Sequence, residues 1–339
     1  MRNLTIPKTD LTVSALCLGA GSLGTRVSPD DSLRLLDEYV EYGGNFLDTA
    51  HIYAVWVPGG EGVSERTIGK WLRTRGVQKE IIIGTKGGHP HLHSMEVPRL
   101  SPAEIAQDLQ ESLERLQVET IDLYWLHRDD PQRPVDELIE TLALAVTQKQ
   151  ICYFGFSNWT VRRMEAALDY EQTHHITGFI GNQVGWSLAQ RNPNIGDPTT
   201  LFMDDEMQNF HKTSGLMVAA YSSQANGFFA GTYGRGLLPP TPGVRAGVVE
   251  AYYNDVNFDR LDRARVLATR YGCTANTIAL GYLISQPSFP TCAIIGCGTS
   301  EHLRDSCAAG DIVLTPQEVA WLEDTQKLSD SAKASASNS

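Results

Sequence analysis

The chain has 339 residues, of which 42% are hydrophobic and 20% are charged, and its net charge is −12. This composition allows a large core, and an acidic chain without a block of basic residues is not expected to bind nucleic acid or a membrane surface. The sequence has no apolar run long enough to span a bilayer, no signal-peptide stretch at its start, and six cysteines without a C-x-x-C pair. These features predict a cytoplasmic protein with reduced thiols.

The order of elements along the chain predicts a barrel. Two short apolar segments on either side of Lys8 predict an N-terminal hairpin that caps one end of it. Strand-like segments follow at 15–18, 45–48, 81–85, 121–126, 151–156, 179–183, 216–221 and 292–295. Amphipathic stretches lie between or after them, at 30–43, 64–74, 102–117, 134–149, 160–172, 204–214, 259–271, 275–285 and 316–327. Eight strands alternating with helices predict a parallel (β/α)8 TIM barrel as a single domain over 1–328, followed by a Ser/Ala-rich tail at 329–339 that we expect to be disordered.

Three of the expected helices begin with the same pattern, a hydroxyl residue followed by proline. The motifs are Ser28-Pro29-Asp30-Asp31, Ser101-Pro102-Ala103-Glu104 and Thr315-Pro316-Gln317-Glu318. The hydroxyl can accept from free N–H groups of the first turn, and proline at the first helical position loses no hydrogen bond. The last two motifs also carry the Glu of a capping box, so all three support the proposed helix starts.

A glycine run follows the first expected barrel strand. Gly19-Ala20-Gly21-Ser22-Leu23-Gly24 has the G-x-G-x-x-G spacing of a Rossmann fingerprint. That fingerprint requires a helix to begin inside the run, whereas the helix signal here comes later, at Ser28-Pro29. We therefore interpret the glycines as small residues that allow a cofactor or backbone to approach the mouth of the barrel.

Four polar residues stand at or just beyond the ends of apolar strand segments. They are Asp48, Tyr53, Lys86 and His127. In a TIM barrel this end of the strands carries the active site, and together the four residues can make a proton donor. Lys86 is expected to lower the pKa of the Tyr53 phenol by its charge, Asp48 to hold Lys86, and His127 to face a carbonyl oxygen. Taken singly, Asp48 and Lys86 also fit a structural ion pair and Tyr53 a core tyrosine, but the set favours catalysis.

With these four residues, the chain resembles the aldo-keto reductase superfamily. The matching motifs are Gly44-Asn45-Phe46-Leu47-Asp48-Thr49-Ala50 with Tyr53, Gly62-Val63-Ser64-Glu65 with Ile68-Gly69, Thr85-Lys86, His127, Gly155-Phe156-Ser157-Asn158, Asn182-Gln183, Tyr221-Ser222, and Gly310-Asp311 through Glu318. Each motif alone is weak evidence for the resemblance, but their order and spacing together are specific. The motifs extend over almost the whole chain. The resemblance implies a TIM barrel that transfers hydride between a carbonyl or alcohol and an extended nicotinamide cofactor.

The resemblance also implies which residues hold that cofactor. Ser157, Asn158 and Gln183 would bind the nicotinamide carboxamide, and Tyr221 would stack on the ring. Along the pyrophosphate and the adenosine the implied residues are Ser222, Gln224, Gly227, Gly296, Thr299, His302 and Ser306. Family members that use NADPH often carry basic residues where this chain has 296–300 and Thr232, so both NADP(H) and NAD(H) remain open.

The loops around the expected mouth of the barrel suggest a small-molecule substrate that is sugar-like or polyhydroxylated. Trp56, His89, Arg128 and Trp159 would supply aromatic surfaces and polar donors. Arg128 with the two acidic residues that follow it fits a surface salt bridge as well. His89, His91 and His93 alternate as zinc ligands can, but Pro90 and the preceding glycines favour a loop, and the proposed chemistry needs no metal.

Two other functions remain as alternatives. The first is a nucleotide-binding regulatory protein of the same fold, like a channel subunit, with little turnover. The second is a metal-dependent TIM-barrel hydrolase, which the spacing of the four residues disfavours. The Gly- and Pro-rich segment 227–257 is expected to fold over the cofactor as a lid. The sequence leaves the substrate, the direction of reaction and the oligomeric state undetermined.

Overall fold

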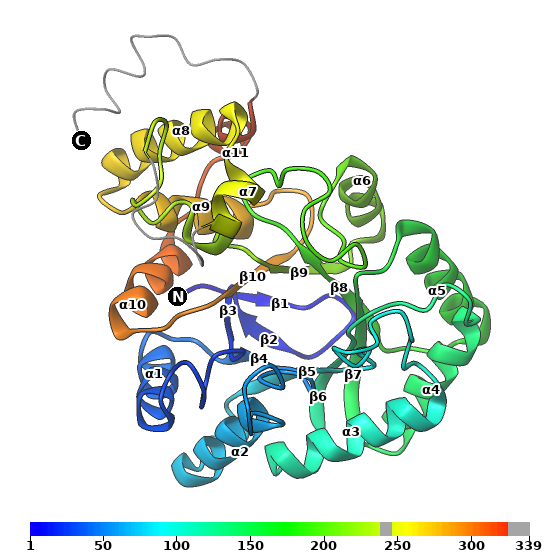
Figure 1. Cartoon of the computed structure of the whole chain (residues 1–339). Coiled ribbons are helices and arrows are strands. Elements are labelled where there is room, and N and C mark those ends of the chain that lie inside the picture. Colours follow the sequence, from blue (N-terminus) through cyan, green and yellow to red (C-terminus); the bar gives the residue numbers. More distant parts are fainter. Residues whose placement is uncertain (238–245, 325–339) are drawn as a thin grey trace.

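The computed structural model describes residues 1–237 and 246–324, and these form a closed barrel of parallel strands ringed by helices (Figure 1). The barrel order is β10-β3-β4-β5-β6-β7-β8-β9, so each strand pairs with its neighbours in sequence and β10 closes the ring on β3. The barrel strands are β3 (Leu16–Gly19), β4 (Phe46–Asp48), β5 (Ile82–Gly87), β6 (Ile121–Leu126), β7 (Ile151–Ser157), β8 (Phe179–Gly185), β9 (Met217–Tyr221) and β10 (Thr291–Ile295). The predicted (β/α)8 TIM barrel is confirmed.

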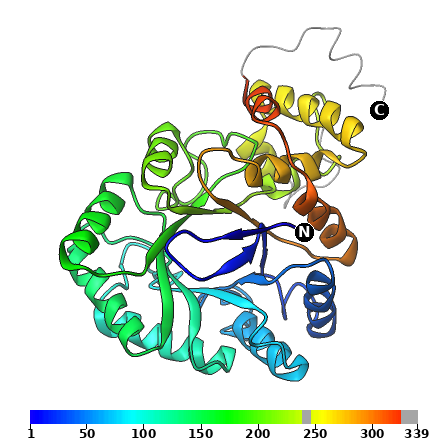
Figure 2. The ribbon, with the colours of Figure 1, turned by 180° about the vertical axis from the view of Figure 1, so that it is seen from behind.

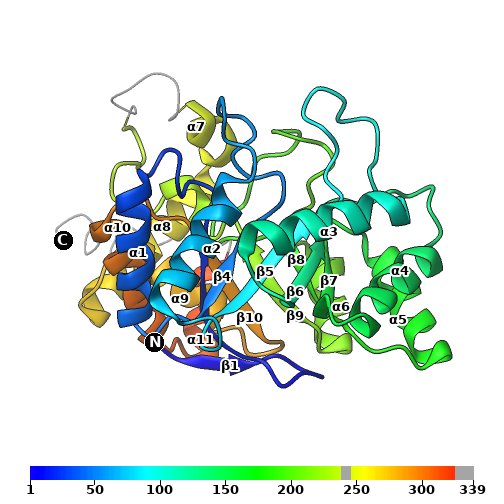
Figure 3. The ribbon, with the colours of Figure 1, turned by 90° about the horizontal axis from the view of Figure 1, so that it is seen from below.

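A hairpin lies across one end of the barrel. Strands β1 (Asn3–Thr5) and β2 (Thr12–Ser14) pair antiparallel, and Figure 2 shows them in front of the barrel opening on that side. Ile6 and Val13 are buried in one cluster with Phe46 and Leu123 of the barrel strands. The hairpin therefore seals the end at which the strands begin, as Figure 3 shows for β1, and leaves the opposite end to the loops.

The helices match the expected stretches closely. They are α1 (Pro29–Glu41), α2 (Val63–Arg75), α3 (Pro102–Leu116), α4 (Val135–Thr147), α5 (Val161–His174), α6 (Asp205–Ser214), α8 (Asp255–Tyr271), α9 (Ala275–Ile284) and α11 (Pro316–Glu323). Helix α8 begins earlier than predicted because the Asn254 side chain accepts from the N–H of Asn257 and caps it. Two further helices, α7 (Ala246–Tyr252) and α10 (Ser300–Ala308), lie outside the expected stretches.

The capping motifs form as predicted. Ser28 accepts from the N–H of Asp31, and complete capping boxes join Ser101 to Glu104 and Thr315 to Glu318. Since α1 begins at Pro29, no helix starts inside the glycine run, which rules out the Rossmann alternative. Gly24 in that run has a φ of +73°, and a Cβ there would lie 2.5 Å from Thr67 Oγ1 of α2.

Part of the segment 227–257 packs as an aromatic cluster. Phe228 is fully buried and its ring lies within 6.3 Å of the rings of Tyr233, Tyr252 and Phe258. The residues between 237 and 246, the predicted tail at 329–339 and the end of the predicted domain at 328 lie outside the described residues, so the lid and the domain division stay predictions.

Glycines in the barrel strands make room for one large side chain. Trp125 of β6 is fully buried inside the barrel, and a Cβ on Gly155 of β7 would lie 2.3 Å from its ring. A Cβ on Gly84 of β5 would lie 3.2 Å from the Trp125 Nε1. Trp125 therefore fills the space that the neighbouring strands leave open.

We expect Gly155→Ala to lower the free energy of unfolding by about 1 to 3 kcal/mol, because the added methyl overpacks the barrel against Trp125. Chemical denaturation measures this. Gly247→Ala is a matched control, since a Cβ at Gly247 in α7 would meet nothing within 4 Å. Equal stability of the two variants would contradict this account of the barrel interior.

Candidate active site

Three of the four predicted residues meet around one ammonium group. Asp48 ends β4, Tyr53 lies in the turn after it, and Lys86 is in β5. Lys86 Nζ donates to Asp48 Oδ2 at 2.7 Å, to the carbonyl oxygen of Thr49 at 2.5 Å and to the Tyr53 hydroxyl at 3.0 Å. These bonds use all three hydrogens of the ammonium. The Tyr53 oxygen is thus an acceptor from Lys86, and its own hydrogen remains free to be donated.

Burial decides the protonation state of Tyr53. Loss of water around the phenol raises its pKa above the ordinary value; the Lys86 charge opposes this shift and the Asp48 charge adds to it. The expected effect of Lys86 is present, because its charge lowers the pKa of Tyr53, but desolvation and Asp48 outweigh it and leave that pKa raised. Tyr53 is a protonated phenol at neutral pH.

Lys86 stays charged in the same surroundings. Burial works to lower the pKa of Lys86, but the contacts with Asp48 and Tyr53 outweigh it and leave that pKa raised. Asp48 and Lys86 are each 1% exposed, so the ion pair is protected from water. Asp48 is also held from the other side, because Gln183 Nε2 of β8 donates to Asp48 Oδ1 at 2.8 Å.

His127 is a neutral imidazole. It follows β6 directly, and its backbone N–H donates to the carbonyl of Gly87 at the end of β5. Burial, together with the charge of Lys86, lowers the pKa of His127 well below its ordinary value. The ring centroid lies 6.0 Å from that of Tyr53, and Nδ1 is buried without a hydrogen-bond partner. A neutral ring beside a phenol can donate one N–H to an oxygen that both groups face.

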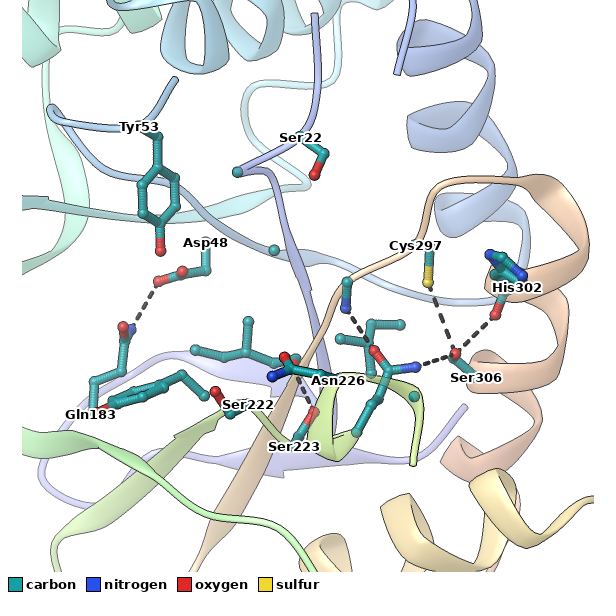
Figure 4. A pocket seen from close by; sticks show the side chains of 18 of the residues that line it. Ser22, Asp48, Tyr53, Gln183, Ser222, Ser223, Asn226, Cys297, His302 and Ser306 are labelled. Atoms are coloured by element: carbon teal, nitrogen blue, oxygen red, sulfur yellow. Dashed lines mark hydrogen bonds between the residues drawn. The ribbon is translucent and has the colours of Figure 1, made fainter. Parts of the chain in front are cut away.

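An elongated cavity of about 610 Å³ starts at these residues. Figure 4 shows Tyr53, Asp48 and Gln183 on one side of it and Cys297, His302 and Ser306 on the other. Gly19 and Gly21 also line it, which supports the interpretation of the glycine run as space at the mouth of the barrel. A long groove with Asp48, Tyr53 and His127 at one end suits an extended dinucleotide.

All but one of the predicted cofactor residues line this cavity. They are Ser157, Asn158, Gln183, Tyr221, Ser222, Gln224, Gly227, Gly296, His302 and Ser306. Thr299 is the exception: its side chain accepts from the N–H of His302 and caps α10.

The side-chain amides of Asn158 and Gln183 differ in how many of their polar atoms already have hydrogen-bond partners. Asn158 Nδ2 donates to the carbonyl of His127 at 3.2 Å, and Asn158 Oδ1 accepts from the N–H of Leu201 at 2.9 Å. The Tyr221 hydroxyl lies 2.8 Å from the same Oδ1. In the Gln183 side chain only Nε2 is hydrogen-bonded within the described part of the chain, to Asp48. The side-chain oxygen Oε1 of Gln183 is therefore the better placed acceptor for a carboxamide.

The far end of the cavity holds residues that the sequence did not single out. Asn276 and Asp305 line it, and Asn276 Nδ2 donates to Asp305 Oδ2 at 2.8 Å. Asn276 Oδ1 is buried without a hydrogen-bond partner. Nothing in the sequence marks Asn276, because it lies inside α9 and only the packing of α9 on α10 brings it to the groove.

The predicted substrate residues fall into three groups. Trp159 is fully buried, stacked on Phe156 at 3.7 Å, so the prediction that it faces a substrate is wrong. Arg128 lines the cavity but is bound to the carbonyl of His127, to Asp197 and to Thr199, so it fixes the loop after β8. Trp56 is 47% exposed and stands edge-on to Tyr53, and His89 packs beside His127.

The alternating histidines do not form a cluster. His91 and His93 stack on each other with centroids 5.5 Å apart, while His89 turns to His127. Over the described ranges, no three His, Cys, Asp or Glu side chains gather as metal ligands do. Nor does any described helix combine the length and the apolar character needed to cross a membrane.

Comparison with known proteins agrees with this geometry. The model of the aldo/keto reductase family matches residues 15–327. The chain belongs to this family. It is 29% identical over 322 residues to an uncharacterized oxidoreductase, YrpG, of Bacillus subtilis, covering 94% of this chain and 93% of the relative. It is 27% identical over 343 residues to the norsolorinic acid reductase stcV of Emericella nidulans, covering 94% and 80%.

A solved structure shares the fold. The thermostable aldo-keto reductase Tm1743, crystallised with the inhibitor epalrestat, aligns with a TM-score of 0.71 at 24% identity, over 96% of this chain and all of that one. As an aldo-keto reductase, this chain is an oxidoreductase with a TIM barrel, and members of the family reduce carbonyl groups of small molecules with a nicotinamide cofactor.

We expect Lys86→Met to lower the free energy of unfolding by about 3 to 5 kcal/mol, because it leaves Asp48 buried without its partner charge. In the double variant Asp48→Asn with Lys86→Met, most of that loss should be recovered, since no buried charge remains. Urea denaturation of the two variants and the wild type measures this. A double variant no more stable than Lys86→Met would contradict the buried ion pair.

Proposed function

We propose that this chain interconverts a carbonyl and an alcohol by NAD(P)(H)-dependent hydride transfer, with Asp48, Tyr53, Lys86 and His127 as the catalytic set. The observation that carries the proposal is the free phenol hydrogen of Tyr53, which results from the full use of the Lys86 ammonium. Membership of the aldo/keto reductase family supports the same reaction.

The roles of the residues follow from their contacts. The bound nicotinamide supplies or accepts the hydride at the substrate carbon. Tyr53 gives its proton to the substrate oxygen during reduction, and Lys86 stabilises the phenolate that remains. His127 donates an N–H to the same oxygen as negative charge grows there. Asp48, fixed by Gln183 on its other oxygen, keeps the ammonium in place.

The proposal includes weak discrimination between NADP(H) and NAD(H). A 2′-phosphate calls for Arg or Lys, and the cavity lining toward α10 has neither among the described residues but contains Asp305. Arg235, a cation of the segment 227–257, is paired with Asp255 and Asp259. Arg245 of the same segment lies outside the described residues.

The proposed substrate is sugar-like or otherwise hydroxylated. The exposed indole of Trp56 beside Tyr53 offers a flat face for a ring, and the imidazole of His89 next to His127 offers a polar contact. The name of the norsolorinic acid reductase describes that relative alone, so it does not decide the substrate of this chain. A cytoplasmic setting is part of the proposal, and the six free cysteines support it.

We expect Tyr53→Phe to lower kcat by at least about 100-fold while nucleotide affinity changes little, because only the proton donor is lost. Steady-state turnover and tryptophan-fluorescence titration with NADPH and NADH measure the two effects. A regulatory protein that merely binds nucleotide would show no turnover to lose. If Tyr53→Phe keeps most of the wild-type rate, another group donates the proton.

The raised pKa of Tyr53 predicts opposite pH dependences for the two directions. Reduction needs the protonated phenol, so kcat/KM for reduction should stay flat from about pH 6 to about pH 9. Oxidation needs the phenolate, so its kcat/KM should rise with pH over the same range. Initial rates in both directions, in one buffer series, test this. A reduction rate that falls already between pH 6 and pH 8 would contradict a protonated Tyr53.

Gly298→Arg should raise the affinity for NADP(H) relative to NAD(H) by roughly tenfold, because it introduces a guanidinium at the loop before α10. A Cβ at Gly298 meets nothing within 4 Å, so the change should not strain the loop. Gly298→Gln is the uncharged control. An unchanged affinity ratio in the Arg variant would mean that this loop does not face the 2′ position.

A further inference from the structure

The far end of the groove carries a buried polar atom without a hydrogen-bond partner. Asn276 lies in the first turn of α9, it lines the groove, and the residue is 4% exposed. Its side-chain oxygen Oδ1 has no partner among the described residues. Leaving a buried carbonyl oxygen unpaired costs free energy, so this position calls for a donor that the described part of the chain does not supply.

The other polar atom of Asn276 fixes the orientation of its amide. Nδ2 donates to Asp305 Oδ2 of α10 at 2.8 Å. A carboxylate can only accept, so the nitrogen must face Asp305, and the oxygen takes the other end of the planar amide. Asp305 is itself held, because Thr274, the N-cap of α9, donates to Asp305 Oδ1 at 2.8 Å. The unpaired atom is therefore an acceptor, and a flipped amide is excluded.

Ser306, which the resemblance implies for this part of the cofactor, already has partners for its hydroxyl. Ser306 Oγ donates to the carbonyl oxygen of His302 at 2.8 Å and accepts from Gln224 Nε2 at 3.0 Å. The Cys297 thiol donates to it as well, and Figure 4 shows Cys297 and His302 beside it. A ligand can bind Ser306 only by replacing one of these bonds, whereas Asn276 Oδ1 has no bond to lose.

The position of Asn276 along the groove decides which part of the cofactor reaches it. The proposed nicotinamide end lies at Tyr53 and His127, so the base of an extended dinucleotide lies at the opposite end, where α9 and α10 meet. Adenine carries an amino group, which donates, on the carbon where other purines carry a keto oxygen, which accepts. We infer that Asn276 Oδ1 accepts a hydrogen bond from this amino group and thereby selects dinucleotides with an adenine base.

This inference rests on the proposed function, because it assumes that the groove holds a nicotinamide dinucleotide. When the base is hypoxanthine, the amino group is replaced by a keto oxygen, so Asn276 Oδ1 loses its donor and faces another acceptor. We expect the dissociation constant of the hypoxanthine analogue to be roughly 10- to 100-fold higher than that of the natural nucleotide.

The test measures binding alone, so it needs no substrate. Tryptophan-fluorescence titrations compare NADH and NADPH with their hypoxanthine analogues. The proteins are the wild type, Asn276→Leu, Asn276→Ala and the control Asn209→Leu, with circular dichroism to show that each is folded. Asn209 is an exposed residue of α6 that does not line the groove, so the control makes the same exchange away from it.

We expect the wild type and Asn209→Leu to bind the natural nucleotides more tightly than the analogues. In Asn276→Leu and Asn276→Ala the two dissociation constants should become equal, because the acceptor is gone, while the nicotinamide end of the groove is unchanged. Two variants at this position are used so that the comparison still stands if one of them fails to fold.

The opposite results separate this inference from the proposed function. Equal affinity of the wild type for a natural nucleotide and its analogue overturns the inference, whether or not the variants fold, and leaves the reductase function intact. A preference that persists in a folded Asn276→Leu or Asn276→Ala protein overturns it too. If none of the dinucleotides binds, the proposed function fails and the inference falls with it.

Discussion

The ammonium of Lys86 is the interaction on which the site depends. It is almost entirely shielded from water, and it donates to the end of β4, to the next residue of the chain and to the phenol that follows. A buried cation is costly unless it is paired and hydrogen-bonded, and here each of its hydrogens has a partner. The same three bonds orient Tyr53, so the stability of the site and its proton chemistry come from one group.

The closed barrel brings these partners together. In the register of β4 and β5, Asp48 pairs with Gly84, which places Lys86 two residues beyond, at the open end. The β5–β6 register sets Lys86 opposite Trp125, and His127 follows two residues later. The hairpin of β1 and β2 covers the other end of the barrel, so these groups lie on the side of the loops.

Burial and the neighbouring charges oppose each other at Tyr53 and Lys86, but they shift the pKa in the same direction at His127 and His89. Desolvation raises the pKa of Tyr53 more than Lys86 lowers it, and it keeps both His127 and His89 neutral. The site therefore combines a phenol and two neutral imidazoles, which form directional hydrogen bonds, with the single charged ammonium of Lys86 next to the phenol. The consequence is a preference for protonated Tyr53 at neutral pH, which suits reduction.

The sequence by itself determined the strand order, the helix caps and the four residues of the candidate site, Lys86 among them. These follow from local periodicity, capping chemistry and motif spacing. All but one of the residues that it predicted to hold the cofactor line the groove. Only the tertiary structure decided that Trp159 is a core residue, that Arg128 ties down the loop after β8, and that Asn276 reaches the groove. It also decided that burial raises the pKa of Tyr53 more than Lys86 lowers it. The physical reason is the same in each case: which face a side chain presents, and how much water it loses, depend on segments far apart in the chain.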